Sequence, residues 1–259
     1  MMKLNNNKKL KMSVIVVNII TIDKIWPQWL VKIRSPQFIM LVIIFIILTT
    51  IVASGLTLKF DYIINQYFLS LQGSKNLDLI MITFTLFGDV STLVVVGIIF
   101  TVIRRTRKMG MIFLINIIML AIIIIYIKPL IGRVAPSYEF VPSIQLPKKS
   151  VIEEDSLMPF ARKLSYPSNH IACISAFAFT VGYLINKRSK AGGLSIWCLP
   201  VIVGITKLYL MQHYLTDIIG GLLLGLITSI ILSNLMRLDE PFLMSRFKRK
   251  EEDDTAKTY

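Results

Sequence analysis

The sequence predicts an all-α protein, a bundle of six transmembrane helices. Its 259 residues are 54% hydrophobic and their mean hydropathy is +0.67, well above the values of ordinary soluble domains. A helix needs roughly 20 mostly apolar residues to cross a bilayer, and six windows come near that length. They are residues 37–58, 79–103, 109–131, 170–185, 194–211 and 215–236. The lipid bilayer is therefore the expected environment of the chain.

The six windows form a single membrane domain, residues 37–236, because no internal repeat or long low-complexity segment divides them. Residues 1–36 precede it as a cytoplasmic segment. Their apolar run 12–22 is short for a signal-peptide core and lacks a small-residue cleavage site, so we expect a retained helix on the membrane surface. Residues 237–259 form a polar cytoplasmic tail that we expect to be disordered.

The net charge of +14 raises the question of a nucleic-acid partner, but the positions of the basic residues argue against one. They flank the windows in four clusters, which six spans place on the same side of the membrane. The positive-inside rule assigns that side, and with it both termini, to the cytoplasm. The clusters are Lys3, Lys8, Lys9, Lys11, Lys24, Lys32 and Arg34; Arg104, Arg105, Arg107 and Lys108; Lys187, Arg188 and Lys190; and Arg246, Lys248, Arg249 and Lys250.

The two histidines of the chain lie at the opposite, extracytoplasmic side of this topology. In the segment TKLYLMQHYLTDIIGG, residues 206–221, His213 and Asp217 are four apart, so on a helix they share one face. The carboxylate can then fix one imidazole nitrogen and leave the other as a nucleophile or base. Taken alone, this spacing favours the alternative, a pair that only caps neighbouring helix ends at the interface.

The segment YPSNH, residues 166–170, opens the fourth window. Ser168 is a good N-cap and Pro167 suits the approach to a helix, and the N-terminus of a helix binds anions. An ordinary capped span would explain Ser168 alone. His170 in the first turn adds a proton donor, which favours an anion site.

The segment KPLIGRVAP, residues 128–136, closes the third window. Lys128 and Arg133 are unfavourable at a membrane boundary unless they snorkel to water or meet an anion. Snorkelling would explain a lone lysine. We expect Gly132 and Pro136 to break the helix, which would give both cations access to the outer surface.

In chain order, residues 128–136, 166–170 and 206–221 resemble the first, second and third motifs of the type 2 phosphatidic acid phosphatase superfamily, integral membrane lipid phosphatases. That family carries a Lys followed seven residues later by Arg-Pro, then Pro-Ser-Gly-His, then Ser-Arg, five residues, His, three residues and Asp. The resemblance implies a six-span fold of the membrane lipid phosphatase type. It implies that His213 is the nucleophile, that Asp217 orients it, and that His170 protonates the leaving alcohol and then activates water.

The same resemblance implies a phosphate site that needs neither a cofactor nor a metal, because fixed cations and amides stabilise the developing charge. The residues it assigns to the phosphate are Lys128, Lys207, Ser168 and the backbone of Asn169.

The sequence departs from the family pattern at four positions. Ala135 stands where the family has Arg, Thr206 and Lys207 stand for Ser-Arg, and Asn169 stands for Gly. Lys207 keeps the charge but lacks the planar fork that grips two phosphate oxygens. Asn tolerates unusual backbone angles better than most residues, so the change at Asn169 is mild.

Arg133 is the candidate substitute for the missing arginine. On a continuous helix it would lie about 140° from Lys128. We hypothesise that a break at Gly132 lets Arg133 reach the phosphate.

The predicted function is that of a membrane phosphatase acting on a lipid phosphate monoester or diphosphate at the extracytoplasmic face, through a phosphohistidine intermediate. By resemblance the candidate substrates are phosphatidic acid, phosphatidylglycerol phosphate and polyprenyl diphosphate. The alternative is a catalytically weak family member that binds or moves anionic lipids, which the losses at Ala135 and Lys207 favour. An ordinary transporter is a more distant possibility, because repeats and broken central helices are not evident.

Two further features receive no role from the sequence. Asp89 lies inside the second window, where an ionisable group is either functional or a hydrogen-bonded helix contact. The loop 137–165 fits a lid, a substrate-selecting surface or a plain connection equally well.

Overall fold

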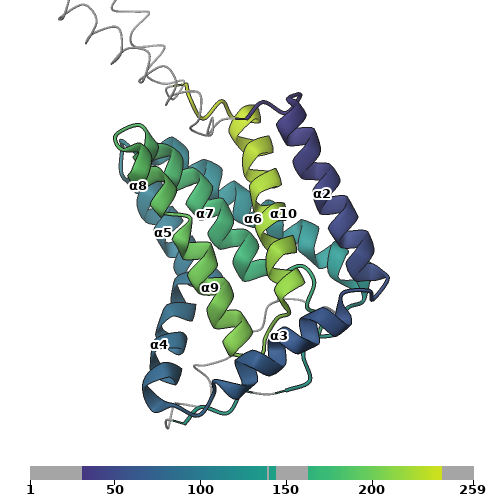
Figure 1. Ribbon diagram of the computed structural model, residues 1–259. Helices are drawn as coiled ribbons and strands as arrows, with labels where there is room; N and C mark the ends of the chain where they lie inside the picture. Colours follow the sequence, from purple (N-terminus) through teal and green to yellow (C-terminus); the bar gives the residue numbers. More distant parts are fainter. Residues whose placement is uncertain (1–30, 139, 144–162, 241–259) are drawn as a thin grey trace, which may run out of the picture. The chain divides into compact units, whose positions relative to one another are not determined.

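The computed structural model describes residues 31–138, 140–143 and 163–240, and this part of the chain is helical with no strand (Figure 1). The predicted surface helix of the first segment lies outside it, as do most of the tail and residues 144–162. The helices are α2 (Pro36–Ala53), α3 (Leu58–Ser70), α4 (Lys75–Thr85), η1 (Leu86–Gly88), α5 (Val90–Val102), α6 (Arg107–Ile131), α7 (Asn169–Asn186), α8 (Lys190–Ser195), α9 (Cys198–Tyr209) and α10 (Leu215–Leu235).

The helices confirm the all-α, multi-span prediction. Within the described residues, five are long and apolar enough to cross a membrane, counting α8 and α9 together. The pair formed by α4–η1 and α5 makes a sixth if it counts as one span. That pair is bent by 48° where η1 meets α5, so the second predicted window is broken rather than straight. The first window ends early, at Ala53, because Gly55 turns the chain with a φ of +76°.

Local sequence explains the ends of several helices. The hydroxyl oxygen of Ser35 accepts a hydrogen bond from the Phe38 amide at 3.3 Å, and Pro36 takes the first helical position, as expected for a capped start. Gly132 ends α6 in the left-handed conformation, with a φ of +66°, a role that glycine fills without strain. The predicted break at Gly132 is confirmed.

Helix α3 was not predicted, because residues 59–78 read as a connection between spans. It is amphipathic. Its buried face carries Asp61 and Asn65, whereas Phe60, Tyr62, Ile63 and Tyr67 are exposed. It lies across the end of the bundle where α9 ends and α10 begins (Figure 1). Just after it, the side-chain Nε2 of Gln72 donates to the carbonyl oxygen of Tyr209 at 2.5 Å.

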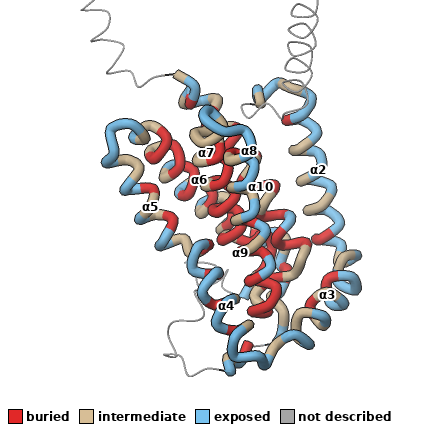
Figure 2. The backbone as a smooth tube through the Cα atoms, turned by 60° about the vertical axis from the view of Figure 1, so that its left-hand side comes forward, coloured by how far each residue is buried: buried red, intermediate tan, exposed pale blue. Residues whose placement is uncertain are grey.

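The core is built around α7 and α10. In the apolar window of α10 72% of residues are buried, against 11% in α2, and Figure 2 shows buried residues along α6, α7 and α10. A Cβ atom on Gly225 would lie 2.3 Å from the Ala172 carbonyl oxygen, and one on Gly221 would lie 2.5 Å from that of Ser168. Small residues thus let the two helices approach closely, which fixes the start of α7 against the start of α10.

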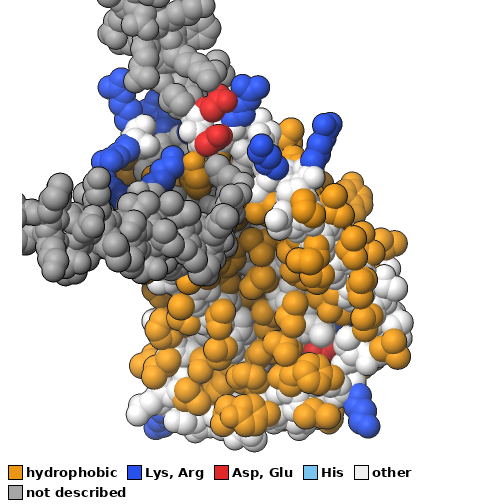
Figure 3. Space-filling model, turned by 45° about the horizontal axis from the view of Figure 1, so that its top comes forward, with side chains coloured by type: hydrophobic (Ala, Val, Ile, Leu, Met, Phe, Trp, Pro, Cys, Tyr) orange, Lys and Arg blue, Asp and Glu red, His pale blue; other side chains and the backbone are white. Residues whose placement is uncertain are grey.

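The surface is divided as a membrane protein requires. Figure 3 shows a face covered by apolar side chains, with most of the visible Lys and Arg toward one end. The Lys108 ammonium at the start of α6 donates to the carbonyl oxygens of Arg237 and Glu240 after α10, at 2.6 and 2.8 Å. The start of α6 and the end of α10 therefore share one end of the bundle, opposite the end where α6 finishes and α10 begins.

Candidate active site

The chain after α6 pairs with the chain before α7. The Ser165 amide donates to the Arg133 carbonyl oxygen at 2.8 Å, and the Ala135 amide donates to that of Lys163 at 3.0 Å. This short ladder carries the first motif alongside the YPSNH segment. Ala135, at the position of the family arginine, takes part in this backbone pairing through its amide.

Tyr166 anchors the YPSNH segment in the bundle. Its hydroxyl lies 2.8 Å from Thr49 Oγ1 on α2, and its ring packs where Gly220 leaves space on α10. Burial raises the pKa of Tyr166 to about 12, so the phenol stays protonated through the physiological range and remains a hydrogen-bond partner for Thr49.

The two lysines expected at the phosphate are buried rather than snorkelling. Lys128 in the last turn of α6 has no exposed surface, and its ammonium donates to the Leu164 carbonyl oxygen at 2.7 Å. Lys207 in the last turn of α9 is 1% exposed, and its ammonium donates to Gln212 Oε1 at 2.8 Å. Cations that are withdrawn from water in this way favour a nearby anion.

The start of α7 presents a polar group toward the site. Ser168 is the N-cap, yet its hydroxyl makes no bond to α7 and has no hydrogen-bond partner among the residues that the structure describes, although it is fully buried. Its amide donates to the Asp217 carbonyl oxygen at 3.2 Å, which ties the second motif to the third. Asn169 is the first residue of the helix itself, so replacing the family glycine there requires no left-handed backbone.

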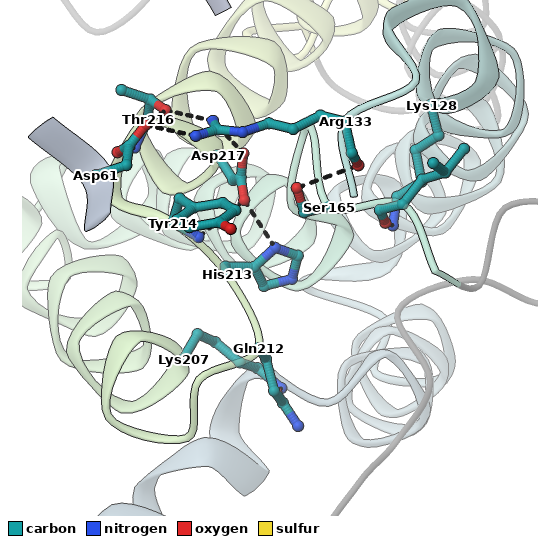
Figure 4. A network of polar contacts seen from close by, with 11 residues as sticks. Asp61, Lys128, Arg133, Ser165, Lys207, Gln212, His213, Tyr214, Thr216 and Asp217 are labelled. Carbon is teal, nitrogen blue, oxygen red and sulfur yellow. Dashed lines mark hydrogen bonds and ion pairs between the residues drawn. The ribbon is translucent and has the colours of Figure 1, made fainter. Parts of the chain in front are cut away.

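His213 and Asp217 meet as predicted, but not along one helix. His213 precedes the N-cap Tyr214, and Asp217 lies in the first turn of α10. The distance from His213 Nδ1 to Asp217 Oδ2 is 3.6 Å, and both side chains are at most 1% exposed. The Tyr214 amide donates to Asp217 Oδ2 at 2.8 Å, so helix capping and imidazole orientation use the same carboxylate. Figure 4 shows this pair and its neighbours.

His170 faces a carboxylate to which the sequence assigned no role. Its Nε2 lies 4.0 Å from Asp89 Oδ1, with the two side chains 1% and 17% exposed. Asp89 does not lie within a continuous span, because it occupies the junction between η1 and α5, where the bent pair breaks. The sequence did carry a signal for this break, because a Gly-Asp dipeptide, Gly88 and Asp89, interrupts the apolar run.

Arg133 reaches the site after the break at Gly132, but its guanidinium meets acidic groups. Nη1 donates to Thr216 Oγ1 at 2.5 Å and to Asp217 Oδ1 at 2.8 Å, while Nη2 donates to Asp61 Oδ2 at 2.5 Å. Its Cζ lies 4.3 Å from the centre of the Tyr214 ring. The phosphate contact predicted for Arg133 stays a prediction, and these contacts favour a different role.

Asp61 is the site residue that sequence reasoning missed. It projects from α3 without exposed surface, and its carboxylate accepts from the Thr216 amide at 3.1 Å and from Thr216 Oγ1 at 2.7 Å. It thereby caps the first turn of α10 from another helix. The only sequence signal was an acidic residue inside an amphipathic stretch, because its partner lies 155 residues away.

The site lies at one end of an α-helical bundle with several candidate spans, and it combines buried cations with two imidazole–carboxylate pairs. These features define the class of the protein as an integral membrane protein. The sequence model of the PAP2 superfamily matches residues 109–240, which is half of the chain. The chain therefore belongs to the PAP2 superfamily, as its motifs indicated.

The fold is shared with a protein of known structure, a transmembrane PAP2-type phosphatidylglycerolphosphate phosphatase from Bacillus subtilis. Its crystal structure matches with a TM-score of 0.62 and 21% sequence identity, covering 80% of this chain and 100% of that chain. At this identity the match establishes the phosphatase-like fold. No curated protein sequence matches the chain significantly.

Proposed function

We propose that this protein hydrolyses a phosphate monoester or diphosphate carried by a membrane lipid, through a phosphohistidine intermediate. The observation that carries the proposal is the His213–Asp217 pair at 3.6 Å, at the end of the bundle where α7 begins and Lys128 and Lys207 are buried. His170, in the first turn of α7, supplies the second imidazole.

The chemistry runs in two displacements. In the first, His213 Nε2 attacks phosphorus, the bond from phosphorus to the lipid oxygen breaks, and His170 gives a proton to the departing oxygen. In the second, His170 takes a proton from water, the water oxygen attacks phosphorus, and the N–P bond breaks to release inorganic phosphate. Asp217 beside Nδ1 stabilises the positive charge that the imidazole carries while the phosphoryl group is attached.

The phosphate oxygens are held by the start of α7 and by the two lysines. The buried Ser168 hydroxyl and the backbone amide of Asn169 supply neutral donors at a helix N-terminus. Lys128 and Lys207 supply charge. Because these groups can neutralise the developing negative charge themselves, the proposed reaction is metal-independent.

The proposed substrate is a lipid because the site lies at the end of spans with apolar surfaces, where a headgroup can be presented from the bilayer. The Bacillus subtilis protein is named for phosphatidylglycerolphosphate, and phosphatidic acid and polyprenyl diphosphate remain candidates for this chain. The proposal puts the site at the extracytoplasmic face, because the basic clusters before α6 and after α7 flank the opposite ends of those helices.

A catalytically weak protein that binds anionic lipids is the second candidate. Ala135 removes a family cation, and the guanidinium of Arg133 is engaged by Asp61 and Asp217. One cation fewer on the phosphate lowers transition-state stabilisation, on the order of 100-fold in rate.

Phosphate release by the purified full chain separates the two candidates. The panel is phosphatidic acid, phosphatidylglycerol phosphate and a polyprenyl diphosphate, each with and without EDTA, and His213→Ala runs beside the wild type. We expect the wild type to release phosphate at a rate that EDTA leaves unchanged. We expect His213→Ala to release none, while it keeps the unfolding temperature and the lipid binding of the wild type. A folded wild type that binds these lipids and releases no more phosphate than the variant would establish the binder instead.

We also expect Asp89→Asn to lower the turnover number roughly 10-fold, because His170 loses the carboxylate that lies 4.0 Å from its Nε2 and orients the ring. Asp78→Asn is the matched control, since Asp78 is a buried carboxylate on the same bent pair and bonds Tyr209 and the Ser143 amide instead. Steady-state phosphate release per folded molecule measures both. Equal turnover of Asp89→Asn and wild type would remove Asp89 from the site.

A further inference from the structure

A buried guanidinium is shared between two carboxylates from different helices. Asp61 and Asp217 have no exposed surface and Arg133 is 7% exposed. Arg133 Nη2 lies 2.5 Å from Asp61 and Nη1 lies 2.8 Å from Asp217. The two carboxylates therefore interact through one cation.

We propose that Arg133 and Asp61 are positioning residues that hold Asp217 against His213, so that α3 completes the active site. The inference rests on the proposed function, because it assigns these residues a part in the same reaction. It replaces the phosphate contact that the sequence predicted for Arg133.

The first step of the argument is geometric. Asp217 is fixed at both oxygens, with Oδ1 accepting from Arg133 and Oδ2 accepting from the Tyr214 amide. A carboxylate held on both sides cannot rotate about its terminal bond. Oδ2 is thereby kept on the side of His213 Nδ1.

The second step concerns charge. Two carboxylates and one guanidinium leave a formal charge of −1 among Asp61, Arg133 and Asp217. If Arg133 paired with Asp217 alone, that carboxylate would be neutralised. Because Asp61 draws on the same guanidinium, Asp217 keeps negative charge for the imidazole that becomes positive on phosphorylation.

The third step concerns the element that carries Asp61. Its carboxylate also receives the amide and hydroxyl of Thr216, next to Asp217 in the first turn of α10, where a negative charge is favoured. Helix α3 thus sets the position of the turn that orients His213. The planar guanidinium of Arg133 can donate to two carboxylates at once, and a lysine ammonium does this less well.

The decisive variant is Asp61→Asn, because the two possible roles of Arg133 predict different turnover numbers for it. If Arg133 is a positioning residue, we expect the turnover number to fall roughly 10-fold, with KM and the Kd of inorganic phosphate within about threefold of the wild type. If Arg133 is a phosphate ligand, loss of Asp61 frees the guanidinium, and both phosphate binding and turnover improve or stay unchanged. Either of the latter results would overturn the inference.

Companion variants keep the test independent of folding. Arg133→Gln is expected to lower the turnover number about 100-fold, and Arg133→Lys should lower it less. Adding Asp61→Asn to Arg133→Gln should lower the turnover number little further. Lys128→Met marks the behaviour of a direct ligand, with a Kd for inorganic phosphate at least about 10-fold weaker. Asp78→Asn controls for loss of a buried carboxylate and should keep its turnover.

The failures are distinguishable. A folded wild type that releases no phosphate from any lipid of the panel would overturn the proposed function and the inference with it. A working wild type whose Asp61→Asn variant lowers only the unfolding temperature, with unchanged turnover per folded molecule, would overturn the inference alone.

Discussion

Replacement of Gly225 by leucine is expected to destabilise the folded protein by about 3 kcal/mol or more. A Cβ atom there would lie 2.3 Å from the Ala172 carbonyl oxygen and 2.9 Å from Ser175 Cβ. The first contact is backbone of α7, which cannot move aside as a flexible side chain can. The variant must therefore separate α7 from α10, and thermal unfolding of the detergent-solubilised protein measures the loss.

Ala191→Leu is the control, because it adds the same side chain at an exposed position of α8 and should change stability by less than about 0.5 kcal/mol. A weaker substitution, Gly225→Ala, should be intermediate and should lower phosphate release more than stability alone explains, because the α7–α10 contact sets Ser168 against Asp217. An unfolding temperature of Gly225→Leu equal to that of the wild type would contradict the close approach.

The positions of the spans follow from the sequence because the bilayer fixes a minimum apolar length. Each of the six predicted windows coincides with α2, α4–α5, α6, α7, α8–α9 or α10 to within a few residues at most ends. Helix α3 escaped prediction because 13 residues are too few to span a membrane and its hydrophobicity is one-sided. A hydropathy criterion for spans does not detect such a helix.

Within the site, the sequence predicted contacts between residues of the same motif. It did not predict contacts between residues that are far apart in the chain. The spacing of His213 and Asp217 predicted their proximity, and Gly132 predicted the end of α6. Spacing within the motif could not show which groups the Arg133 side chain contacts, because one of them, Asp61, is 72 residues away. In the structure its guanidinium lies between two buried carboxylates, those of Asp61 and Asp217.

Replacement of His170 by asparagine is expected to lower hydrolysis of lipid phosphate by about 100-fold to 10,000-fold, because the proposed mechanism makes His170 the general acid and base, a role that contributes that much. The loss should depend on the leaving group. An aryl phosphate, whose leaving group needs no proton, should still phosphorylate His213 in this variant. Water should then attack slowly, since the base is missing.

The phosphorylated protein should therefore accumulate in His170→Asn and be absent from His213→Asn. Rapid mixing with a labelled aryl phosphate, followed by an alkaline quench that preserves phosphohistidine, measures it directly. Label in His213→Asn, or none in a folded His170→Asn, would contradict the assignment of nucleophile and acid. The separation is expected because each imidazole faces its own carboxylate, His213 at 3.6 Å from Asp217 and His170 at 4.0 Å from Asp89, so removing one ring leaves the other's carboxylate in place.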